Sequence, residues 1–373
     1  MFGGFFLGLQ PNFKIFMQQS VFDLMQQMEH EQVVFCHDPH SGLNAIIAIH
    51  NTTLGPALGG TRLWNYNSHE EGIIDALRLS RGMTYKAAIS GLNLGGGKAV
   101  IIGDASKVKS EALWRRYGKF VNSLNGKYIT AEDVNTSAPD MEYIALETDH
   151  VTGVPEYMGG SGDPSPFTAR GVYMGMKAAA KKAWGNDSLS GKKVLVQGVG
   201  HVGQYLVGHL VQDGAKVYIT DINQDKIKQT KDKFSTVEIV DGDKIWDLDI
   251  DIYAPCALGA TVNTESIAKM KCPVIAGAAN NQLADENVHG PILIEKGIIY
   301  VPDFLINAGG LINVAAELED YNRDRVIGNV DKIYARTLEI LDLSDREKIH
   351  AQAAAMKIAQ KRLTDIANVK ARL

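Results

Sequence analysis

The spacing of apolar residues changes along the chain, and these changes predict the secondary structure. Residues 33–51 form two mainly apolar runs on either side of the turn Asp38–Gly42, which predicts two short strands in a hairpin or near-hairpin. Residues 69–90 carry apolar side chains close to a helical period. A glycine-rich loop, a strand over 98–102 and a helix over about 107–124 follow, and strand and helix then alternate until about Val151.

The second half of the chain has a more regular pattern. Residues 153–166 are rich in Gly, Pro and Ser and are interpreted as a linker or hinge, followed by a long helix over about 168–184. The predicted strands beyond it are 193–197, 216–220 and short segments near Val237, Ile252, Val274 and Ile299, with helices over about 202–213 and 225–234. Such alternation indicates βαβ units and a mostly parallel sheet with helices on both faces.

These elements predict an α/β protein of two domains separated by a cleft, in agreement with a length of 373 residues. The first domain, an α/β domain, is expected over 1–152, and the second, a doubly wound Rossmann-type domain, over 153–345. A C-terminal helix over 346–373 is expected to pack back on the first domain. The hinge would let the cleft close and exclude water.

Composition narrows the class of protein. With 45% hydrophobic and 22% charged residues the chain is globular, and its net charge of −5 disfavours nucleic acid or an anionic membrane as a partner. No apolar run reaches the roughly 18 residues of a membrane span. The apolar stretch 1–9 lacks the basic region and cleavage site of a secretory signal, and residues 1–17 are interpreted as a tag, an upstream start or an extension. Three cysteines without metal-type spacing suit a reducing, cytoplasmic location.

One glycine motif predicts a dinucleotide site. It follows the strand 193–197, precedes an apolar helix, and is paired with Asp221 at the end of the next strand. The glycines serve the tight turn, the close approach of the pyrophosphate and the helix–strand contact, and the helix N-terminus favours the anion. Asp221 should accept hydrogen bonds from ribose hydroxyls and repel a 2′-phosphate, which favours NAD over NADP. The motif consists of Gly198, Val199, Gly200, His201, Val202 and Gly203.

A second glycine loop, Gly91–Gly97, is followed by Lys98. It is not the phosphate loop of an NTPase, since the first required glycine falls at Leu92 and Ala99 replaces the hydroxyl residue. Bare backbone there is expected to let a substrate lie beside the Lys98 ammonium. Lys86 is also near, and two ammonium groups in a partly buried pocket would lower each other's pKa, so that one acts as a base and the other holds an anion. The alternative is two solvated lysines.

Several motifs together resemble a known family. Leu58–Arg62, Arg81–Lys86 and Gly91–Val100 resemble the amino acid dehydrogenases that act on glutamate, leucine, phenylalanine and valine. The resemblance runs from about Val21 to the C-terminal helices. It also includes Thr130–Val134, Asn280–Gln282 and Asn307–Gly310.

This resemblance implies an enzyme that oxidatively deaminates an L-amino acid to the 2-oxo acid, ammonia and NADH. It implies Lys98 as the catalytic base, Lys86 as the ligand of the substrate carboxylate and Asp133 in proton transfer. The chemistry suits these roles, because a lysine of lowered pKa can deprotonate the water that attacks the iminium carbon. For Asp133 the alternative is an N-cap of the next helix.

The resemblance also assigns the ends of the substrate pocket. Thr168 and Asn280 would contact the nicotinamide carboxamide or the nearby substrate, although Asn280 and Asn281 would also serve as turn residues. Because no charge falls among the wall positions, glutamate is disfavoured and a shared range of leucine, isoleucine and valine is expected. Ordinary core packing is the alternative for Met83 and Leu311. The wall positions are Leu58, Gly59, Met83, Leu311 and Val314.

Other interpretations stay open at this point. A valine- or phenylalanine-preferring member of the family fits the same motifs, as does a non-catalytic NAD-binding protein. Members acting on leucine are typically homo-octamers, which implies the same assembly here, with 1–152 as the substrate-binding, catalytic and oligomerisation domain. Cys256 as a thiol nucleophile is disfavoured for lack of a nearby base, and a metal site is not expected, since His37 and His40 fit a solvated turn. Asn135 stands where many relatives have glycine.

Overall fold

The computed structural model describes residues 20–371, so the apolar stretch 1–9 and residues 1–17 lie outside the described residues. The described chain divides into two compact units. The N-terminal unit comprises 20–162, 313–322 and 359–371, and the second unit comprises 163–312 and 323–358. Within the described range, no helix combines the length and apolarity needed to cross a membrane.

The N-terminal unit is built on a five-stranded sheet with the strand order β1-β2-β4-β3-β5. The predicted hairpin is confirmed, with β1 antiparallel to β2 and β2 antiparallel to β4, whereas β3 runs parallel to both of its neighbours. The strand β3 has no counterpart in the predicted elements. The bounds are β1 Gln32–Asp38, β2 Leu43–Asn51, β3 Ala57–Trp64, β4 Gly95–Ile102 and β5 Tyr128–Glu132.

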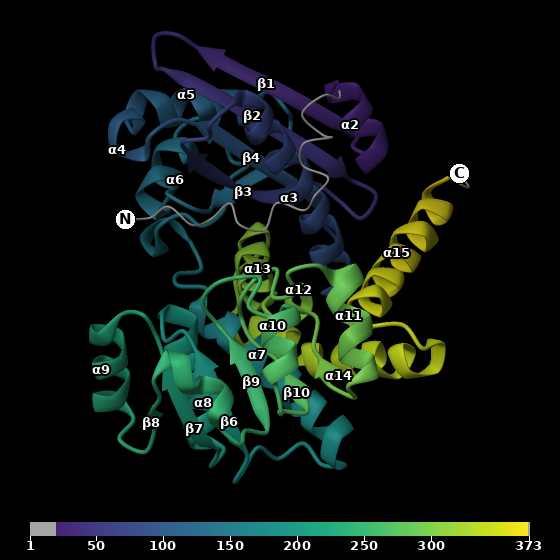
Figure 1. The fold of residues 1–373 in the computed structure, drawn as a ribbon. Helices are drawn as coiled ribbons and strands as arrows, with labels where there is room; N and C mark the ends of the chain where they lie inside the picture. The colour runs from purple at the N-terminus through teal and green to yellow at the C-terminus, as the bar shows by residue number, and fades with distance from the viewer. Residues whose placement is uncertain (1–19, 372–373) are drawn as a thin grey trace. The chain divides into compact units, whose positions relative to one another are not determined.

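Helices cover both faces of this sheet (Figure 1). The predicted helix over 69–90 is α3, His69–Ile89, which packs with the short α2, Val21–Met28, on the face that includes Val100. On the other face, Trp114 and Tyr117 of α5 pack on Ala99 and Ile101. This second face is covered by α5 Glu111–Asn122 and α6 Ala138–Ala145.

The helix predicted over about 107–124 is confirmed as α5, Glu111–Asn122, but its predicted start is wrong, because a separate short helix precedes α5. This short helix, α4, spans Ala105–Val108 and stops at Lys109, whose backbone is extended. Ser110 then caps α5, and its hydroxyl accepts a hydrogen bond from the Leu113 amide. The serine offers the backbone a new helix start, which a reading of apolar spacing alone does not detect.

The loop predicted at Gly91–Gly97 is wrong for its last three residues, because Gly95–Gly97 are the start of β4 and are buried. A Cβ built on Gly96 would lie 2.1 Å from the backbone nitrogen of Thr84, and one on Gly97 would lie 2.6 Å from the ring of Tyr128. Protein atoms from α3 and β5 therefore already occupy the space beside these glycines. Their function is close packing, and the expectation of bare backbone open to a substrate is wrong.

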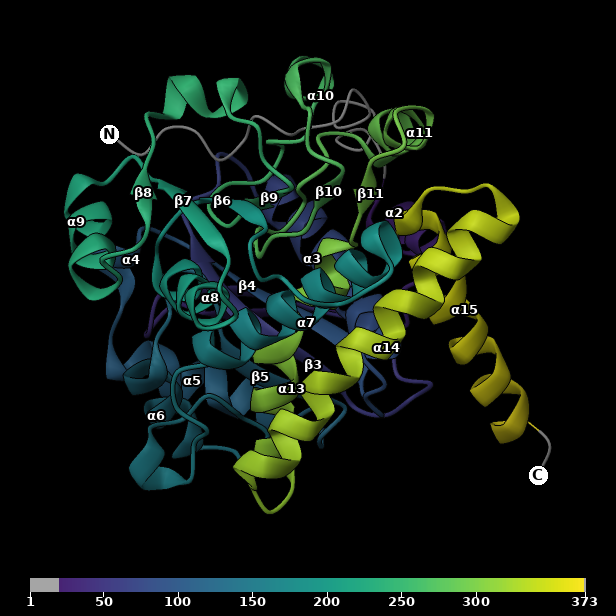
Figure 2. The same ribbon diagram turned by 90° about the horizontal axis from the view of Figure 1, so that it is seen from below.

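The second unit holds a six-stranded parallel sheet with the order β11-β10-β9-β6-β7-β8, as Figure 2 shows. The order reverses at β6, which is the doubly wound arrangement expected of a Rossmann-type unit. The strands are β6 Lys193–Gln197, β7 Lys216–Thr220, β8 Glu238–Ile239, β9 Ile252–Pro255, β10 Val274–Ile275 and β11 Ile299–Tyr300.

Helices connect these strands at short spacing, as the sequence predicts. The helix α7 leads into β6 and packs against α8 and α14. The helices are α7 Ser165–Trp184, α8 His201–Gln212, α9 Gln224–Lys233, α10 Thr264–Lys269, α11 Glu286–Glu295, α12 Asp303–Ile306 and α13 Gly309–Ala315.

Two long helices end the chain, α14 Arg323–Glu347 and α15 Ala351–Lys370. Arg170 of α7 holds Asp331 of α14 through an Nε–Oδ1 contact of 2.6 Å. The end of α15 belongs to the N-terminal unit, where Nη1 of Arg362 donates to the carbonyl oxygen of Leu92 at 2.7 Å. The chain thus passes from one unit to the other after residues 162, 312, 322 and 358, whereas the domain bounds predicted from the sequence lie after 152 and 345.

Candidate active site

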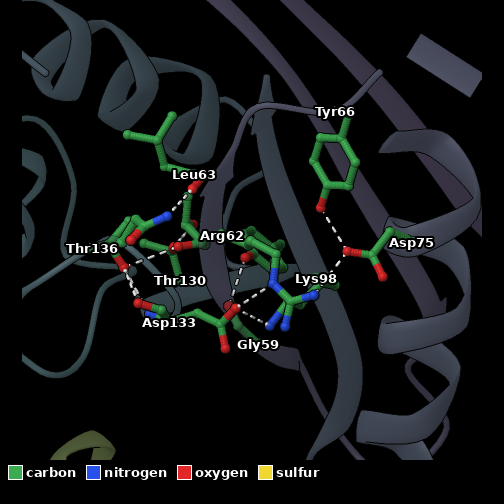
Figure 3. A network of polar contacts seen from close by, with 12 residues as sticks. Gly59, Arg62, Leu63, Tyr66, Asp75, Lys98, Thr130, Asp133 and Thr136 are labelled. Carbon is green, nitrogen blue, oxygen red and sulfur yellow. Dashed lines mark hydrogen bonds and ion pairs between the residues drawn. The ribbon is translucent and has the colours of Figure 1, made fainter. Parts of the chain in front are cut away.

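Lys98 is positioned by the alternation of side chains along β4. Gly96 and Val100, two residues to either side, face α3, so the Lys98 side chain leaves the sheet on that same face. The residue is only 4% exposed. Its Nζ lies 2.9 Å from Oδ2 of Asp133, which follows the end of β5 (Figure 3). The fold therefore brings together two of the residues to which the sequence assigned chemistry.

Asp133 is held by the loop that follows β5. Its amide donates to Oγ1 of Thr136 at 2.7 Å, and that hydroxyl donates to the carbonyl oxygen of Thr61 on β3. Asn135 has a left-handed backbone with φ 59°, a conformation natural to glycine and tolerated by asparagine, and its Nδ2 donates to the carbonyl oxygen of Leu63. The N-cap position of α6 is Ser137, so the interpretation of Asp133 as that cap is wrong.

A third charged residue joins this pair. Nε of Arg62, on β3, lies 3.0 Å from Oδ2 of Asp133, and its Nη1 lies 2.9 Å from Oδ2 of Asp75 on α3. The Tyr66 hydroxyl donates to the same oxygen of Asp75 at 2.6 Å. Figure 3 shows the resulting chain of polar contacts across β3, β4 and α3.

Sequence reasoning did not assign a role to Arg62, Asp75 or Tyr66. Arg62 ends the motif Leu58–Arg62 and was therefore visible as part of the resemblance. Asp75 is an acidic residue in the first half of an amphipathic helix, where an exposed carboxylate is the ordinary expectation. Only the three-dimensional fold shows that β3 and α3 bring these two side chains together.

The electrostatics of the pair suit acid–base chemistry. Burial lowers the pKa of Lys98, with Asp133 opposing the shift and Arg62 adding to it. Burial alone would raise the pKa of Asp133, but Lys98 and Arg62 outweigh it and lower this pKa to about 2. Asp133 is therefore a carboxylate at neutral pH, and Lys98 loses its proton more easily than an ordinary lysine.

The other predicted residues of the N-terminal unit lie near these elements. Lys86 and Met83 are half-buried on α3, on either side of Thr84, whose backbone nitrogen faces Gly96 of β4. Leu58 is buried, and a Cβ on Gly59 would lie 1.7 Å from the carbonyl oxygen of Gly97. Gly59 thus serves the close approach of β3 and β4.

Two wall positions predicted on the C-terminal side lie on α13, where the chain passes from one unit to the other. Leu311 belongs to the second unit and Val314 to the N-terminal unit. Both side chains are half-buried.

The glycine motif of the second unit has the geometry of a dinucleotide turn. Gly198 has φ +103°, and a Cβ on Gly203 would lie 2.1 Å from the carbonyl oxygen of Gly198, so both positions require glycine. By contrast, a Cβ on Gly200 would meet only Nζ of Lys226, at 3.8 Å. Gly200 is the cap residue directly before α8, whose first residue is His201. The space at Gly200 and the helix N-terminus fit a pyrophosphate.

Asp221, at the end of β7, is tied to this turn. Its Oδ2 accepts a hydrogen bond from the Val199 amide at 2.8 Å, and its Oδ1 accepts one from the Asn223 amide. Each oxygen keeps a further acceptor position, which is what a ribose hydroxyl needs. The residues present therefore fit NAD.

The residues predicted for the nicotinamide end also gather in the second unit. Nδ2 of Asn307 donates to Oδ1 of Asn280 at 2.6 Å, which joins two of the motifs. A Cβ on Gly310 would lie 2.8 Å from Oγ1 of Thr168. The turn interpretation holds for Asn281, which has φ 51°, whereas the Asn280 side chain is engaged by Asn307.

The alternative chemistries gain no support. Burial raises the pKa of the Cys256 thiol to about 12, so it is a poor nucleophile near neutral pH. All three cysteines are free thiols. His37 and His40 are exposed, and no cluster of three or more possible metal ligands occurs among residues 20–371.

The parallel sheet, the glycine turn and Asp221 define an NAD-binding protein of the Rossmann type. Comparison with known proteins extends this class. Residues 30–150 match the Glu/Leu/Phe/Val dehydrogenase dimerisation domain, and residues 159–223 and 218–370 match the Glutamate/Leucine/Phenylalanine/Valine dehydrogenase family. The chain belongs to this family and is an NAD-dependent amino acid dehydrogenase, an enzyme of oxidative deamination.

Individual relatives cover nearly the whole chain. A leucine dehydrogenase of Thermoactinomyces intermedius is 56% identical over 344 residues, 92% of this chain and 93% of that protein. A leucine dehydrogenase of Bacillus subtilis is 54% identical over 92% of this chain and 94% of that protein. The crystal structure of L-tryptophan dehydrogenase from Nostoc punctiforme superposes with a TM-score of 0.83 at 42% identity, over 93% of this chain and 99% of that one.

Proposed function

We propose that this enzyme catalyses the reversible oxidative deamination of L-leucine and other branched-chain L-amino acids to the 2-oxo acid, ammonia and NADH. The observation that carries the proposal is the buried Lys98–Asp133 pair, 2.9 Å apart, in which Lys98 has a lowered pKa. The similarity to leucine dehydrogenases over nearly the whole chain supports the choice of substrate.

NAD would be held by the Gly198–Gly203 turn and by Asp221, and when bound it would supply the hydride acceptor for the substrate Cα. The Lys86 ammonium holds the substrate carboxylate and so fixes the direction of the Cα–H bond. Neutral Lys98 takes a proton from the water that adds to the iminium carbon, and later returns it to the nitrogen that leaves as ammonia. Asp133 is ionised in the resting enzyme and holds Nζ of Lys98. It takes a proton from the substrate ammonium and passes it on to solvent, which restores the carboxylate.

Substrate choice rests on the apolar wall. We assign it to Leu58, Gly59, Met83, Leu311 and Val314, none of which is charged. Leucine, isoleucine and valine differ by one methylene or its placement, which an apolar pocket separates by only about 1–3 kcal/mol. A valine- or phenylalanine-preferring enzyme is the alternative within the family. One relative with this fold is an L-tryptophan dehydrogenase, so an aromatic amino acid is a substrate class to test.

A non-catalytic NAD-binding protein is the alternative of a different class. Against it, the chain retains Lys86, Lys98 and Asp133, and the last two form the ion pair described above. For assembly we propose a homo-octamer in which the N-terminal unit supplies subunit contacts, since residues 30–150 match a domain described as a dimerisation domain. Light scattering of the purified protein should give the mass of eight chains.

The test of the proposed function is a substrate panel. Initial rates of NADH formation would be measured with leucine, isoleucine, valine, phenylalanine, tryptophan and glutamate, with NAD or NADP. We expect the aliphatic substrates with NAD to give the highest kcat/KM. A higher value for phenylalanine, tryptophan or glutamate would overturn the substrate assignment. Absence of NADH formation by folded, NAD-binding protein would favour the non-catalytic alternative.

A further inference from the structure

One oxygen of Asp133 is shared between two cations. Nζ of Lys98 lies 2.9 Å and Nε of Arg62 lies 3.0 Å from the same Oδ2. The Arg62 guanidinium also reaches Asp75 on α3 through Nη1, so its plane is fixed at both ends. Arg62 and Asp75 are each about a quarter exposed, whereas the Lys98 side chain is 6% exposed.

We propose that Arg62 is a positioning residue that remains the counter-ion of Asp133 while Lys98 gives up its proton, so that Lys98 can cycle between its charged and neutral states. The inference rests on the proposed function, because it concerns the lysine that acts there as the base. It assigns to Arg62 no contact with substrate or cofactor.

The physical argument concerns the state in which Lys98 is neutral. If Lys98 were the only cation beside Asp133, its deprotonation would leave a largely buried carboxylate unpaired, which is a costly arrangement. That penalty would keep Lys98 protonated. Arg62 removes the penalty, because a guanidinium stays charged throughout the working pH range and keeps its bond to Oδ2.

The charges that face Lys98 come from three other structural elements. Lys98 on β4 is faced by Asp133 after β5, by Arg62 on β3 and by Asp75 on α3. With Lys98 protonated these four groups sum to zero charge, and with Lys98 neutral they sum to −1. Loss of Arg62 would make both states more negative by one charge, and the added negative charge favours protonated Lys98.

Tyr66, the last residue in this chain of polar contacts, is uncharged. Burial raises the pKa of Tyr66 well above its usual value, and Asp75 raises it further, so the phenol stays protonated and donates to Asp75. Asp75 itself opposes Arg62, because its negative charge raises the pKa of Lys98. The arrangement thus predicts opposite effects of neutralising Arg62 and Asp75.

The test compares Arg62→Gln with Arg62→Lys and with a matched control. The pH dependence of kcat/KM for leucine deamination has an acid limb where the base becomes protonated. We expect this limb to move up by about 1–3 pH units in Arg62→Gln, the usual effect of one neighbouring charge, and to return toward wild type in Arg62→Lys. Arg115→Gln is the control. Arg115 lies on α5, on the opposite face of the sheet, and forms an ion pair with Glu147 there.

A second readout does not use activity. In protein carrying [ε-¹³C]lysine, the Lys98 resonance would be assigned by its loss in Lys98→Arg and then titrated in wild type and in Arg62→Gln. The proposal predicts a higher Lys98 pKa in Arg62→Gln. An unchanged pKa and an unchanged acid limb in active, folded Arg62→Gln would overturn it.

Two further outcomes keep the proposals distinguishable. If Arg62→Gln does not fold, Asp75→Asn replaces it, and there the acid limb and the Lys98 pKa should fall; an unchanged or raised pKa would overturn the proposal. If wild-type protein binds NAD without deaminating any amino acid while its Lys98 pKa still rises in Arg62→Gln, the proposed function fails and the electrostatic effect of Arg62 stands.

Discussion

Lys98 and Asp133 form an ion pair whose two members are unequally enclosed. Their Nζ–Oδ2 distance is 2.9 Å, but the lysine side chain is 6% exposed and the aspartate side chain 24%. Burial lowers the pKa of the lysine, whereas two cations outweigh burial at the carboxylate and keep it ionised with a pKa of about 2. Lys98 is therefore the partner that gives up its proton more easily, and the first two predictions follow from this difference.

Replacing Lys98 should abolish turnover through loss of the base. We expect both Lys98→Met and Lys98→Arg to lower kcat by about 10²–10⁴-fold, because a guanidinium keeps the charge and yet cannot act as a base. The affinity for the cofactor, measured by fluorescence titration with NADH, should be unchanged. Lys109→Met is the matched control, since Lys109 forms a comparable 2.6 Å pair with Asp140. Near-normal kcat in Lys98→Arg would contradict the assignment.

Neutralising Asp133 should shift the pH profile in the opposite direction to Arg62→Gln. Asp133 raises the pKa of Lys98, so in Asp133→Asn this pKa falls and the acid limb of kcat/KM moves to lower pH, by about 1–3 units. The maximum rate should also fall, because Nζ loses the oxygen that positions it. A limb that moves to higher pH would show that Asp133 does not act on Lys98 as the contact implies.

The glycines before Lys98 should respond to substitution as packing residues. A Cβ on Gly96 would lie 2.1 Å from the Thr84 nitrogen and 2.4 Å from the Ser80 carbonyl oxygen, so Gly96→Ala should lower the free energy of unfolding by about 1–3 kcal/mol or more. Gly82, on the exposed side of α3, has no atom within 4 Å of such a Cβ, and Gly82→Ala should stabilise by up to about 1 kcal/mol. Urea unfolding measures both. Equal stability of the two variants would refute the packing role.

The second unit was the more predictable half, for a local reason. In β6, α8 and β7 the strand, the glycine turn, the helix and Asp221 follow each other within one short stretch, so each signal lies beside the next in sequence. The α/β class and the doubly wound sheet are therefore confirmed. The strand β3 was missed because Gly59 and Gly60 weaken its strand signal, although contacts with β4 and β5 hold it in the sheet.

The candidate site was predictable where a resemblance supplied the residues. Lys98 and Asp133 were named from their motifs, and the structure adds that they are in contact. Arg62 and Asp75 were given no role, because their ion pair depends on how β3 and α3 pack, and no local sequence pattern encodes that packing. The interpretation of Gly95–Gly97 as backbone open to a substrate was wrong for the same reason. The residues that fill the space beside these glycines, Thr84 and Tyr128, come from other elements.

Asp221 should determine the choice of cofactor. Asp221→Ser removes the carboxylate that would meet a 2′-phosphate and weakens the hydrogen bonds to the ribose, so KM for NAD should rise about 10–100-fold and measurable activity with NADP should appear. Steady-state kinetics with both cofactors measures this. Asp225→Asn, in the exposed first turn of α9, should leave the ratio unchanged. If Asp221→Ser kept the wild-type preference, another residue would have to select NAD.

Two buried histidines beneath α3 should make the enzyme sensitive to acid. Nε2 of His30 donates to the carbonyl oxygen of Leu77, Nδ1 of His50 accepts from Oγ1 of Thr84, and the two rings lie 4.8 Å apart. Burial lowers their pKa values to about 4 and about 3 from 6.5. The unfolded chain therefore binds these protons first as the pH falls.

The stability that these neutral histidines support is thus complete above pH 6.5 and is lost progressively as the pH falls toward 4 and 3. The urea midpoint should drop steeply between pH 6.5 and 4.5 in wild type, and less steeply in the double variant His30→Asn, His50→Asn, which binds up to two fewer protons on unfolding. The exposed His40 supplies the control variant His40→Asn, which should keep the wild-type slope. The measured quantity is the slope of the urea midpoint against pH in each protein, so a general loss of stability in the double variant does not affect the comparison. Equal slopes in wild type and double variant would place the acid sensitivity elsewhere in the protein.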